Sequence, residues 1–220
     1  MIARELLGTA RVPGGEELRL FSHGRDFIIA LGRNELMSTR MRGSEEALAT
    51  MTLARLAAPA PRLLIGGYGM GFTLRAALAG RPQVRVTVAE LVPEILAWAR
   101  GPMEALTAGC LDDPRVELRL GDVADAIAAG RGAWDGVLLD VDNGPDGLVR
   151  AANDRLYSRD GLAAVRAALR PGGLLAVWSA GRDPAFTRRL RAAGFAVDEV
   201  EVRARANGKG PRHLIWFARR

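Results

Sequence analysis

A glycine-rich turn directly after a short apolar run is the feature that most constrains what this chain can fold into. The apolar run covers residues 63–65, and a helical pattern follows over residues 73–78. Four glycines lie between them: Gly66, Gly67, Gly69 and Gly71. A strand that ends in such a turn and continues into a helix lets backbone N–H groups approach a ligand closely. Glycines also serve ordinary turns, so a purely structural turn stays open at this point.

An acidic residue further along favours the ligand. Glu90 lies 19 positions after Gly71, at the end of a second apolar run over residues 84–89. In α/β folds that bind nucleosides, an acidic residue at the tip of the next strand, about 20 residues on, holds the ribose diol. The two features together predict a nucleotide or nucleoside site.

Composition limits the class of protein. The chain has 220 residues, of which 49% are hydrophobic, so one domain with a small appendage is expected. The longest apolar runs have the length of strands, and residues 1–5 lack the charged-then-apolar pattern of a signal peptide. Cys110 is the single cysteine, so we expect no internal disulfide, and no residues beside it suggest a metal site. We expect a cytoplasmic protein without a metal and without membrane contact.

The positive charge has two interpretations. A net charge of +6 and a pI near 10.7 would permit nucleic-acid binding. Lys209 is the single lysine, however, and the arginines are scattered through every segment. Their densest cluster lies on one predicted helix and comprises Arg182, Arg188, Arg189 and Arg191. A solvated helix face accounts for it more simply, so we do not expect a nucleic-acid partner.

Residues 1–58 are predicted to form an N-terminal β segment and a linking helix. The runs 18–21 and 27–31 flank a five-residue loop with glycine, which is typical of a hairpin, and a third strand covers 35–38. Ser44 is placed to cap a helix over residues 45–57. Pro59 and Pro61 end it and mark the boundary to a second domain over residues 59–220.

Strands and helices alternate from Arg62 onward. Strands are predicted at 62–65, 84–89, 116–120, 136–139 and 174–179, and helices at 72–79, 93–106, 123–129, 159–169 and 184–193. The runs 195–203 and 212–218 form a closing hairpin joined by Asn207-Gly-Lys-Gly210. This order predicts an α/β, Rossmann-like, doubly wound seven-stranded sheet with an antiparallel last strand.

Ligands of open α/β sheets bind at the carboxyl ends of the strands. Besides the glycine turn and Glu90, these ends carry Asp122 and the pair Asp140 and Asp142. Asp122 and the N–H of Val123 are placed to recognise an adenine, and Asp140 and Asp142 lie where the reacting end of the ligand is expected. The alternatives are that Asp122 caps the next helix and that Asp140 and Asp142 stabilise a turn.

The order of these motifs resembles the spermidine synthase family. The resemblance extends over most of residues 17–180 and includes Asp113-Pro-Arg-Val116 with Gly121-Asp122, Trp134-Asp135 with Asp140, Leu156-Tyr-Ser158 and Leu169-Arg-Pro-Gly-Gly173. It implies the class I S-adenosylmethionine-dependent methyltransferase fold and a donor that is S-adenosylmethionine or its decarboxylated form. The residues implied to bind the donor are Gly66, Gly67, Gly69, Gly71, Glu90, Leu91, Asp122 and Val123. It also implies a small-molecule acceptor, such as an amine, and a homodimer.

The departures from the family fall on the acceptor end. The family's glycine loop carries an Asp, but here it reads Gly66-Gly-Tyr-Gly-Met-Gly71 without a carboxylate. The motif after the fourth strand of the second domain is shortened, so Asp140 aligns and Asp142 is a candidate substitute for the family's base. A Tyr-His-Glu signature is replaced by Gly43-Ser-Glu-Glu-Ala47, in which Glu45 or Glu46 could supply a carboxylate.

The leading hypothesis is therefore a spermidine synthase-like transferase that moves an aminopropyl or methyl group from a sulfonium donor to a small nucleophile. Asp140, or Asp142 in its place, would orient or deprotonate the acceptor. Two alternatives remain at this point. One is an RNA or DNA methyltransferase, and the other is a non-catalytic nucleoside-binding homologue.

Overall fold

The computed structural model describes residues 3–141 and 155–220, and Asp142 lies outside them. A small antiparallel sheet comes first, in the order β1-β2-β3-β4. Its strands are β1 (Glu5–Arg11), β2 (Glu17–His23), β3 (Asp26–Leu31) and β4 (Asn34–Ser38). The short helix η1 (Thr39–Met41) leads into α1 (Gly43–Arg55). The hairpin and the third strand were predicted; β1 was not, because Gly8 interrupts its pattern and a bulge shifts its register between Leu6 and Gly8.

The large sheet has seven strands in the order β10-β11-β9-β8-β5-β6-β7. These are β5 (Arg62–Gly66), β6 (Arg85–Glu90), β7 (Val116–Leu120), β8 (Trp134–Leu139), β9 (Leu169–Ser179), β10 (Ala196–Arg203) and β11 (Arg212–Arg219). The five strands β5 to β9 pair in parallel, whereas β11 is antiparallel to both β9 and β10. The predicted fold class is confirmed.

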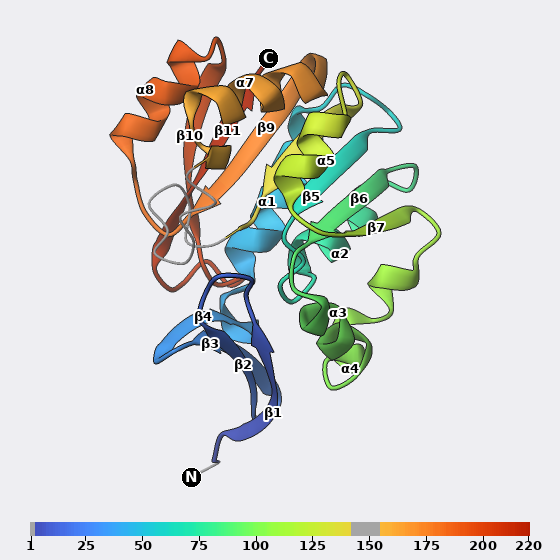
Figure 1. The fold of residues 1–220 in the computed structure, drawn as a ribbon, viewed down its shortest axis with the longest axis vertical. Coiled ribbons are helices and arrows are strands. Elements are labelled where there is room, and N and C mark those ends of the chain that lie inside the picture. Colours follow the sequence, from blue (N-terminus) through green and yellow to red (C-terminus); the bar gives the residue numbers. More distant parts are fainter. Residues whose placement is uncertain (1–2, 142–154) are drawn as a thin grey trace.

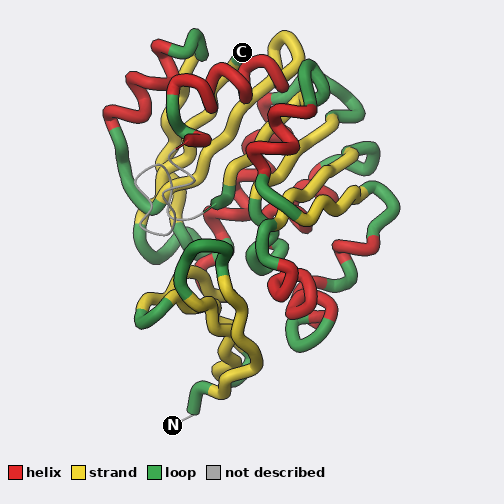
Figure 2. The backbone as a smooth tube through the Cα atoms, in the orientation of Figure 1, coloured by secondary structure: helices red, strands yellow, loops and turns green. Residues whose placement is uncertain are grey.

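Helices cover both faces of this sheet (Figures 1 and 2). Buried residues of α1, α2 (Phe72–Gly80) and α3 (Pro93–Arg100) pack with one face, and those of α5 (Val123–Ala129), α7 (Arg159–Ala168) and α8 (Pro184–Ala192) with the other. Strand side chains alternate between the two cores, so Ile65 and Leu138 belong to the first and Leu64 and Leu139 to the second. Buried neighbours on both faces explain why these strands are apolar throughout.

Two boundaries differ from the prediction for identifiable reasons. The predicted helix 93–106 is divided into α3 and the short α4 (Glu104–Thr107), with the 3₁₀ turn η2 (Cys110–Asp112) after it. Pro102 lacks the N–H that would continue the helix, and the residue before a proline disfavours helical geometry. The strand predicted at 174–179 begins earlier, at Leu169, and residues 170–173 form a bulge within β9: Leu169 pairs with Trp134, but the next pair is Leu174 with Gly136.

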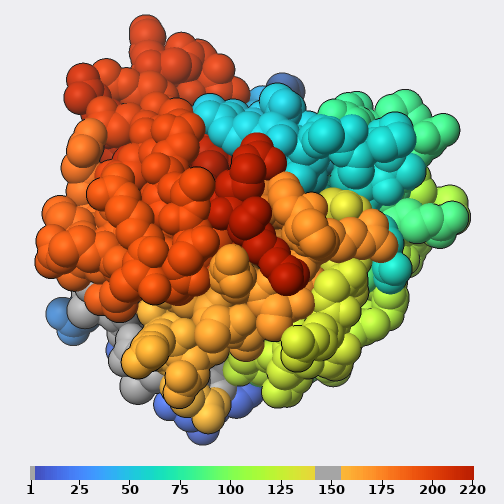
Figure 3. Space-filling view, turned by 90° about the horizontal axis from the view of Figure 1, so that it is seen from above, coloured from blue at the N-terminus to red at the C-terminus, as the bar shows by residue number. Residues whose placement is uncertain are grey.

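The small sheet lies at the end of the molecule that faces the carboxyl ends of the parallel strands (Figure 1). The opposite end is closed by the C-terminus, where the Arg220 N–H donates to the Gly173 carbonyl and Arg219 Nη2 donates to the Arg55 carbonyl. Figure 3 views the molecule from that end and shows the last strand between the segment around residues 55–80 and helices α7 and α8. The small sheet meets the carboxyl ends of the parallel strands at the other end, and the candidate site lies there.

Candidate functional site

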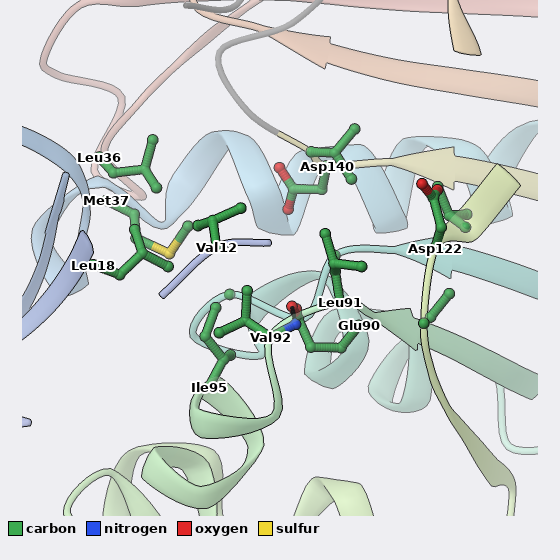
Figure 4. Close-up of a pocket in the computed structure, with 16 residues that line it drawn as sticks. Val12, Leu18, Leu36, Met37, Glu90, Leu91, Val92, Ile95, Asp122 and Asp140 are labelled. Carbon is green, nitrogen blue, oxygen red and sulfur yellow. Dashed lines mark hydrogen bonds between the residues drawn. The ribbon is translucent and has the colours of Figure 1, made fainter. Parts of the chain in front are cut away.

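A pocket lies between the strand ends and the small sheet and encloses about 730 Å³ of empty space, part of it open to solvent. On the large-sheet side it is lined by Gly67, Gly69, Ala89, Glu90, Leu91, Val92, Ile95, Gly121, Asp122, Val123, Asp140 and Val141. The small-sheet side contributes Val12, Leu18, Leu36 and Met37, and Figure 4 shows the two groups facing one another.

The glycine turn has most of its N–H groups bonded within the protein. The Gly67 N–H donates to the Ala89 carbonyl (2.9 Å), the Tyr68 N–H to Glu90 Oε2 (2.8 Å) and the Gly71 N–H to the Tyr68 carbonyl (2.8 Å). Gly67 has φ +86°, and a Cβ there would lie 2.6 Å from the Asp140 carbonyl oxygen. The turn therefore requires glycine for its conformation and its close packing.

The four predicted glycines have different positions. Gly67 and Gly69 line the pocket, but Gly66 and Gly71 do not. A Cβ on Gly66 would lie 2.8 Å from Cγ2 of Val123, so this glycine allows β5 to pack against α5. Gly71 has φ +77° and precedes the first turn of α2. Both glycines therefore affect the conformation of the turn without lining the pocket themselves.

Glu90 binds the backbone of the glycine turn from the end of β6. It is 5% exposed at the end of β6, with Oε2 accepting from the Tyr68 N–H and Oε1 from the Val92 N–H, both at 2.8 Å. Burial raises the pKa of its carboxyl group above the ordinary value, and the N–H groups of Val92 and Tyr68 oppose that shift. Carboxylate oxygens have two lone pairs each, so two ribose hydroxyls could still donate to this group.

Asp122 caps a helix and also lines the pocket. Its Oδ1 accepts from the Ala124 N–H at 2.9 Å and caps α5, as the structural alternative required. It also lines the pocket together with Gly121 and Val123, to the right of Asp140 and Glu90 in Figure 4. Leu91, which was also predicted to contact the donor, lines the pocket next to Glu90.

Asp140 follows β8 and lines the pocket above Glu90 in the view of Figure 4. Its Oδ2 accepts from Thr73 Oγ1 at 2.8 Å, and its own N–H donates to the Gly66 carbonyl at 3.0 Å. Burial raises the pKa of Asp140 to about 6, although the Thr73 hydroxyl acts in the opposite direction. A carboxyl group with that pKa can accept a proton near neutral pH.

Several pocket residues were not singled out from the sequence. Val12, Leu18, Leu36 and Met37 come from the small sheet, and apolar strand residues carry no signal that separates a pocket wall from a core. Thr73 was recognised only as the start of a helix. Thr73 Oγ1 also lies 3.3 Å from the backbone carbonyl oxygen of Glu45 in α1. Burial, together with the charge of Asp140, raises the pKa of the Glu45 carboxyl group.

Within residues 3–141 and 155–220, no group of three or more His, Cys, Asp or Glu side chains is arranged to hold a metal ion. No helix in the same part of the chain is long and apolar enough to cross a membrane.

Sequence comparison finds polyamine aminopropyltransferases. The chain is 31% identical over 157 residues to polyamine aminopropyltransferase 1 of Streptomyces coelicolor, which is 67% of this chain and 28% of that protein. It is 34% identical over 119 residues to the enzyme of Nitrosomonas europaea, which is 54% of this chain and 35% of that protein. The chain thus spans well under two thirds of these relatives. No protein-family model matches it.

Structural comparison finds the same fold. A spermidine synthase from Thermotoga maritima superposes with a TM-score of 0.75 at 18% identity, covering 97% of this chain and 72% of that one. A human methyltransferase-like protein 13 in complex with SAH gives a TM-score of 0.64 at 21% identity, covering 80% of this chain and 81% of that one. These likenesses establish a class I methyltransferase-like fold for the chain.

Proposed function

We propose that this chain, which belongs to the spermidine synthase-like family, is a transferase that moves an aminopropyl group from decarboxylated S-adenosylmethionine to a small-molecule amine. The observation that carries this proposal is the charge of the pocket. Its three charged lining residues are Glu90, Asp122 and Asp140, and the described lining residues include no arginine, lysine or histidine.

Charge separates the two sulfonium donors. The decarboxylated donor carries two positive groups, a sulfonium and an amine, which carboxylates attract. S-adenosylmethionine carries an additional carboxylate, which would enter a pocket of like charge without a cationic partner. Like charges in a partly buried site disfavour one another strongly.

Backbone donors offer the carboxylate little compensation. Anions commonly bind to the free N–H groups of a glycine turn at a helix N-terminus. In this turn the N–H groups of Gly67, Tyr68 and Gly71 already have protein acceptors. The donor that lacks the carboxylate is therefore the better match, although the glycine turn has lost the family's Asp.

The chemistry requires alignment and one proton acceptor. The amine nitrogen of the acceptor attacks the aminopropyl carbon attached to sulfur, the C–S bond breaks, and its electron pair stays on sulfur, giving neutral methylthioadenosine. The attacking nitrogen then loses its proton, which Asp140 would accept. Glu90 would hold the ribose diol, and Asp122 with Val123 the adenine.

The test is a turnover assay that separates the two transfers. Purified protein is incubated with an equimolar mixture of both donors and with a panel of primary amines, and the products are identified by mass spectrometry. We expect methylthioadenosine together with an amine enlarged by one aminopropyl group. S-adenosylhomocysteine with a methylated acceptor would contradict the proposal, and binding without any product would favour a non-catalytic homologue.

We also propose, from the family resemblance, a cytoplasmic enzyme of polyamine biosynthesis that acts as a homodimer, with a domain boundary near residues 58 and 59. Light scattering coupled to gel filtration would test the dimer, for which the mass of one chain is 23.6 kDa. A single species of that mass would contradict it.

A further inference from the structure

A bulge in β4 turns two consecutive side chains toward the pocket. Met37 pairs with Ile29 of β3, whereas Glu35 pairs with the next residue of β3, so Leu36 is an extra residue between two pairs. Successive side chains of a regular strand point to opposite faces of the sheet. Here Leu36 and Met37 both line the pocket, and each is half-buried. Bulges commonly redirect a side chain beside a binding site in this way.

Met37 extends from the small sheet toward the glycine turn. A Cβ on Gly69 would lie 3.1 Å from Met37 Sδ and 3.2 Å from its Cε. Val12 and Leu18, which are 7% and 3% exposed, line the pocket on the same side as Leu36 and Met37. These four side chains are called the apolar wall below.

Figure 4 shows where the apolar wall lies relative to the carboxylates. Asp122 is at the right, Glu90 and Asp140 are in the middle, and the apolar wall lies to their left. Val92 and Ile95, at the start of α3, line the pocket below the apolar wall in this view. With the adenine at Asp122 and the ribose at Glu90, the acceptor would lie between Asp140 and the apolar wall.

The described residues at this end offer an amine a single carboxylate. The charged lining residues within 3–141 and 155–220 are Glu90, Asp122 and Asp140. In the proposed function the first two hold the donor, so Asp140 is the described carboxylate that remains beside the reacting groups. A second ammonium group on the acceptor would lose water against the apolar wall without gaining a partner there, which is unfavourable. An alkyl or aromatic group in the same place would gain from leaving water.

We propose that the acceptor is a primary monoamine with an apolar body, and that Leu36 and Met37 select it over a diamine. This rests on the proposed function and narrows its acceptor to one class. The nitrogen lies at Asp140, which takes the proton after the attack, and the alkyl or aryl body lies against the apolar wall. The products are methylthioadenosine and a secondary amine that carries the aminopropyl group.

The test compares two acceptors of similar shape. Pentylamine has a methyl group where 1,4-diaminobutane has its second amine. Each is assayed with decarboxylated S-adenosylmethionine at the same pH, and release of methylthioadenosine gives kcat/KM. Calorimetry measures the binding of each amine to protein saturated with methylthioadenosine, which leaves the acceptor end free. We expect pentylamine to exceed the diamine by about tenfold or more in both measurements.

Leu36→Ala and Leu36→Glu test the apolar wall, with Leu6→Ala as the matched control. Leu6 belongs to the same small sheet, is 52% exposed and does not line the pocket. L36A should lower kcat/KM for pentylamine about fivefold or more and change that for the diamine by less than about twofold. L36E adds a carboxylate to the apolar wall and should reverse the preference. L6A should leave both values unchanged, and donor affinity should stay within about threefold in every variant.

A preference of the wild-type protein for the diamine would overturn this inference and leave aminopropyl transfer in place. An equal loss for both amines in L36A would overturn it as well. L36A remains informative if L36E does not fold, because it introduces no charge. Failure of the wild-type protein to release methylthioadenosine with any amine would instead overturn the proposed function.

Discussion

Glu90 and Asp140 are carboxylates at the ends of the two strands that flank β5, and their surroundings differ. Both oxygens of Glu90 accept a backbone N–H at 2.8 Å, whereas Asp140 Oδ2 accepts from the Thr73 hydroxyl at 2.8 Å. The backbone thus fixes the Glu90 carboxylate before any ligand binds. The arrangement around Asp140 leaves negative charge uncompensated, which a bound cation would relieve. In the proposed function, Glu90 would therefore meet the donor already held in place, whereas Asp140 would interact with the acceptor through its charge.

Removing the base should have the largest effect. Asp140→Asn keeps an oxygen that can accept from Thr73 but cannot take a proton. We expect kcat to fall by about 10²- to 10⁴-fold, the usual contribution of general base catalysis. Donor affinity, measured by calorimetry, should remain close to that of the wild type. Loss of donor binding in D140N would contradict this assignment, because Asp140 would then contribute to donor affinity as well as to turnover.

Replacing Glu90 should weaken donor binding instead. Glu90→Ala deletes the two hydrogen bonds expected to the ribose, each worth about 1.5–3 kcal/mol for a charged group, so donor affinity should fall about 10²- to 10⁴-fold. It also leaves the Tyr68 and Val92 N–H groups without their acceptor, at about 1–3 kcal/mol each. Thermal unfolding should show that loss of stability. An unchanged Kd would mean that Glu90 serves the glycine turn alone.

The buried Asp140 carboxylate should lower the free energy of unfolding at neutral pH. The pKa of Asp140 is raised from 3.8 to about 6, so near pH 5 the folded state binds a proton that the unfolded chain has lost. Stability therefore falls as pH rises from about 4 to about 6 and stays reduced above that. We expect Asp140→Asn to stabilise the protein by about 1–3 kcal/mol at pH 7.5 and by less at pH 4. A lower Tm at pH 7.5 would contradict this.

The helix cap should give the smallest effect. Asp122→Ala removes the acceptor of the Ala124 N–H, which typically costs about 1 kcal/mol of stability. Since Asp122 also lines the pocket, donor affinity should fall by less than in E90A. Urea unfolding and calorimetry on the same sample measure both. Asp122→Asn, which can still cap the helix, separates capping from adenine recognition.

The sequence predicted the order of the strands and helices well because their apolar runs are bounded by glycine and proline. It could not show that the N–H groups of the glycine turn are already bonded, since the acceptors Ala89 and Glu90 lie about 20 residues away. It also could not choose between Glu45 and Glu46, because that choice depends on how α1 sits against β10 and α2. Asp142 lies outside the described residues, so its predicted role stays a prediction.

The donor preference tests the central claim most directly. Calorimetry with decarboxylated S-adenosylmethionine and with S-adenosylmethionine, under identical salt and pH, measures how much the additional carboxylate of S-adenosylmethionine changes its affinity for the pocket. We expect the decarboxylated donor to bind at least tenfold more tightly. Equal or tighter binding of S-adenosylmethionine would contradict a pocket selected for cations and would indicate methyl transfer.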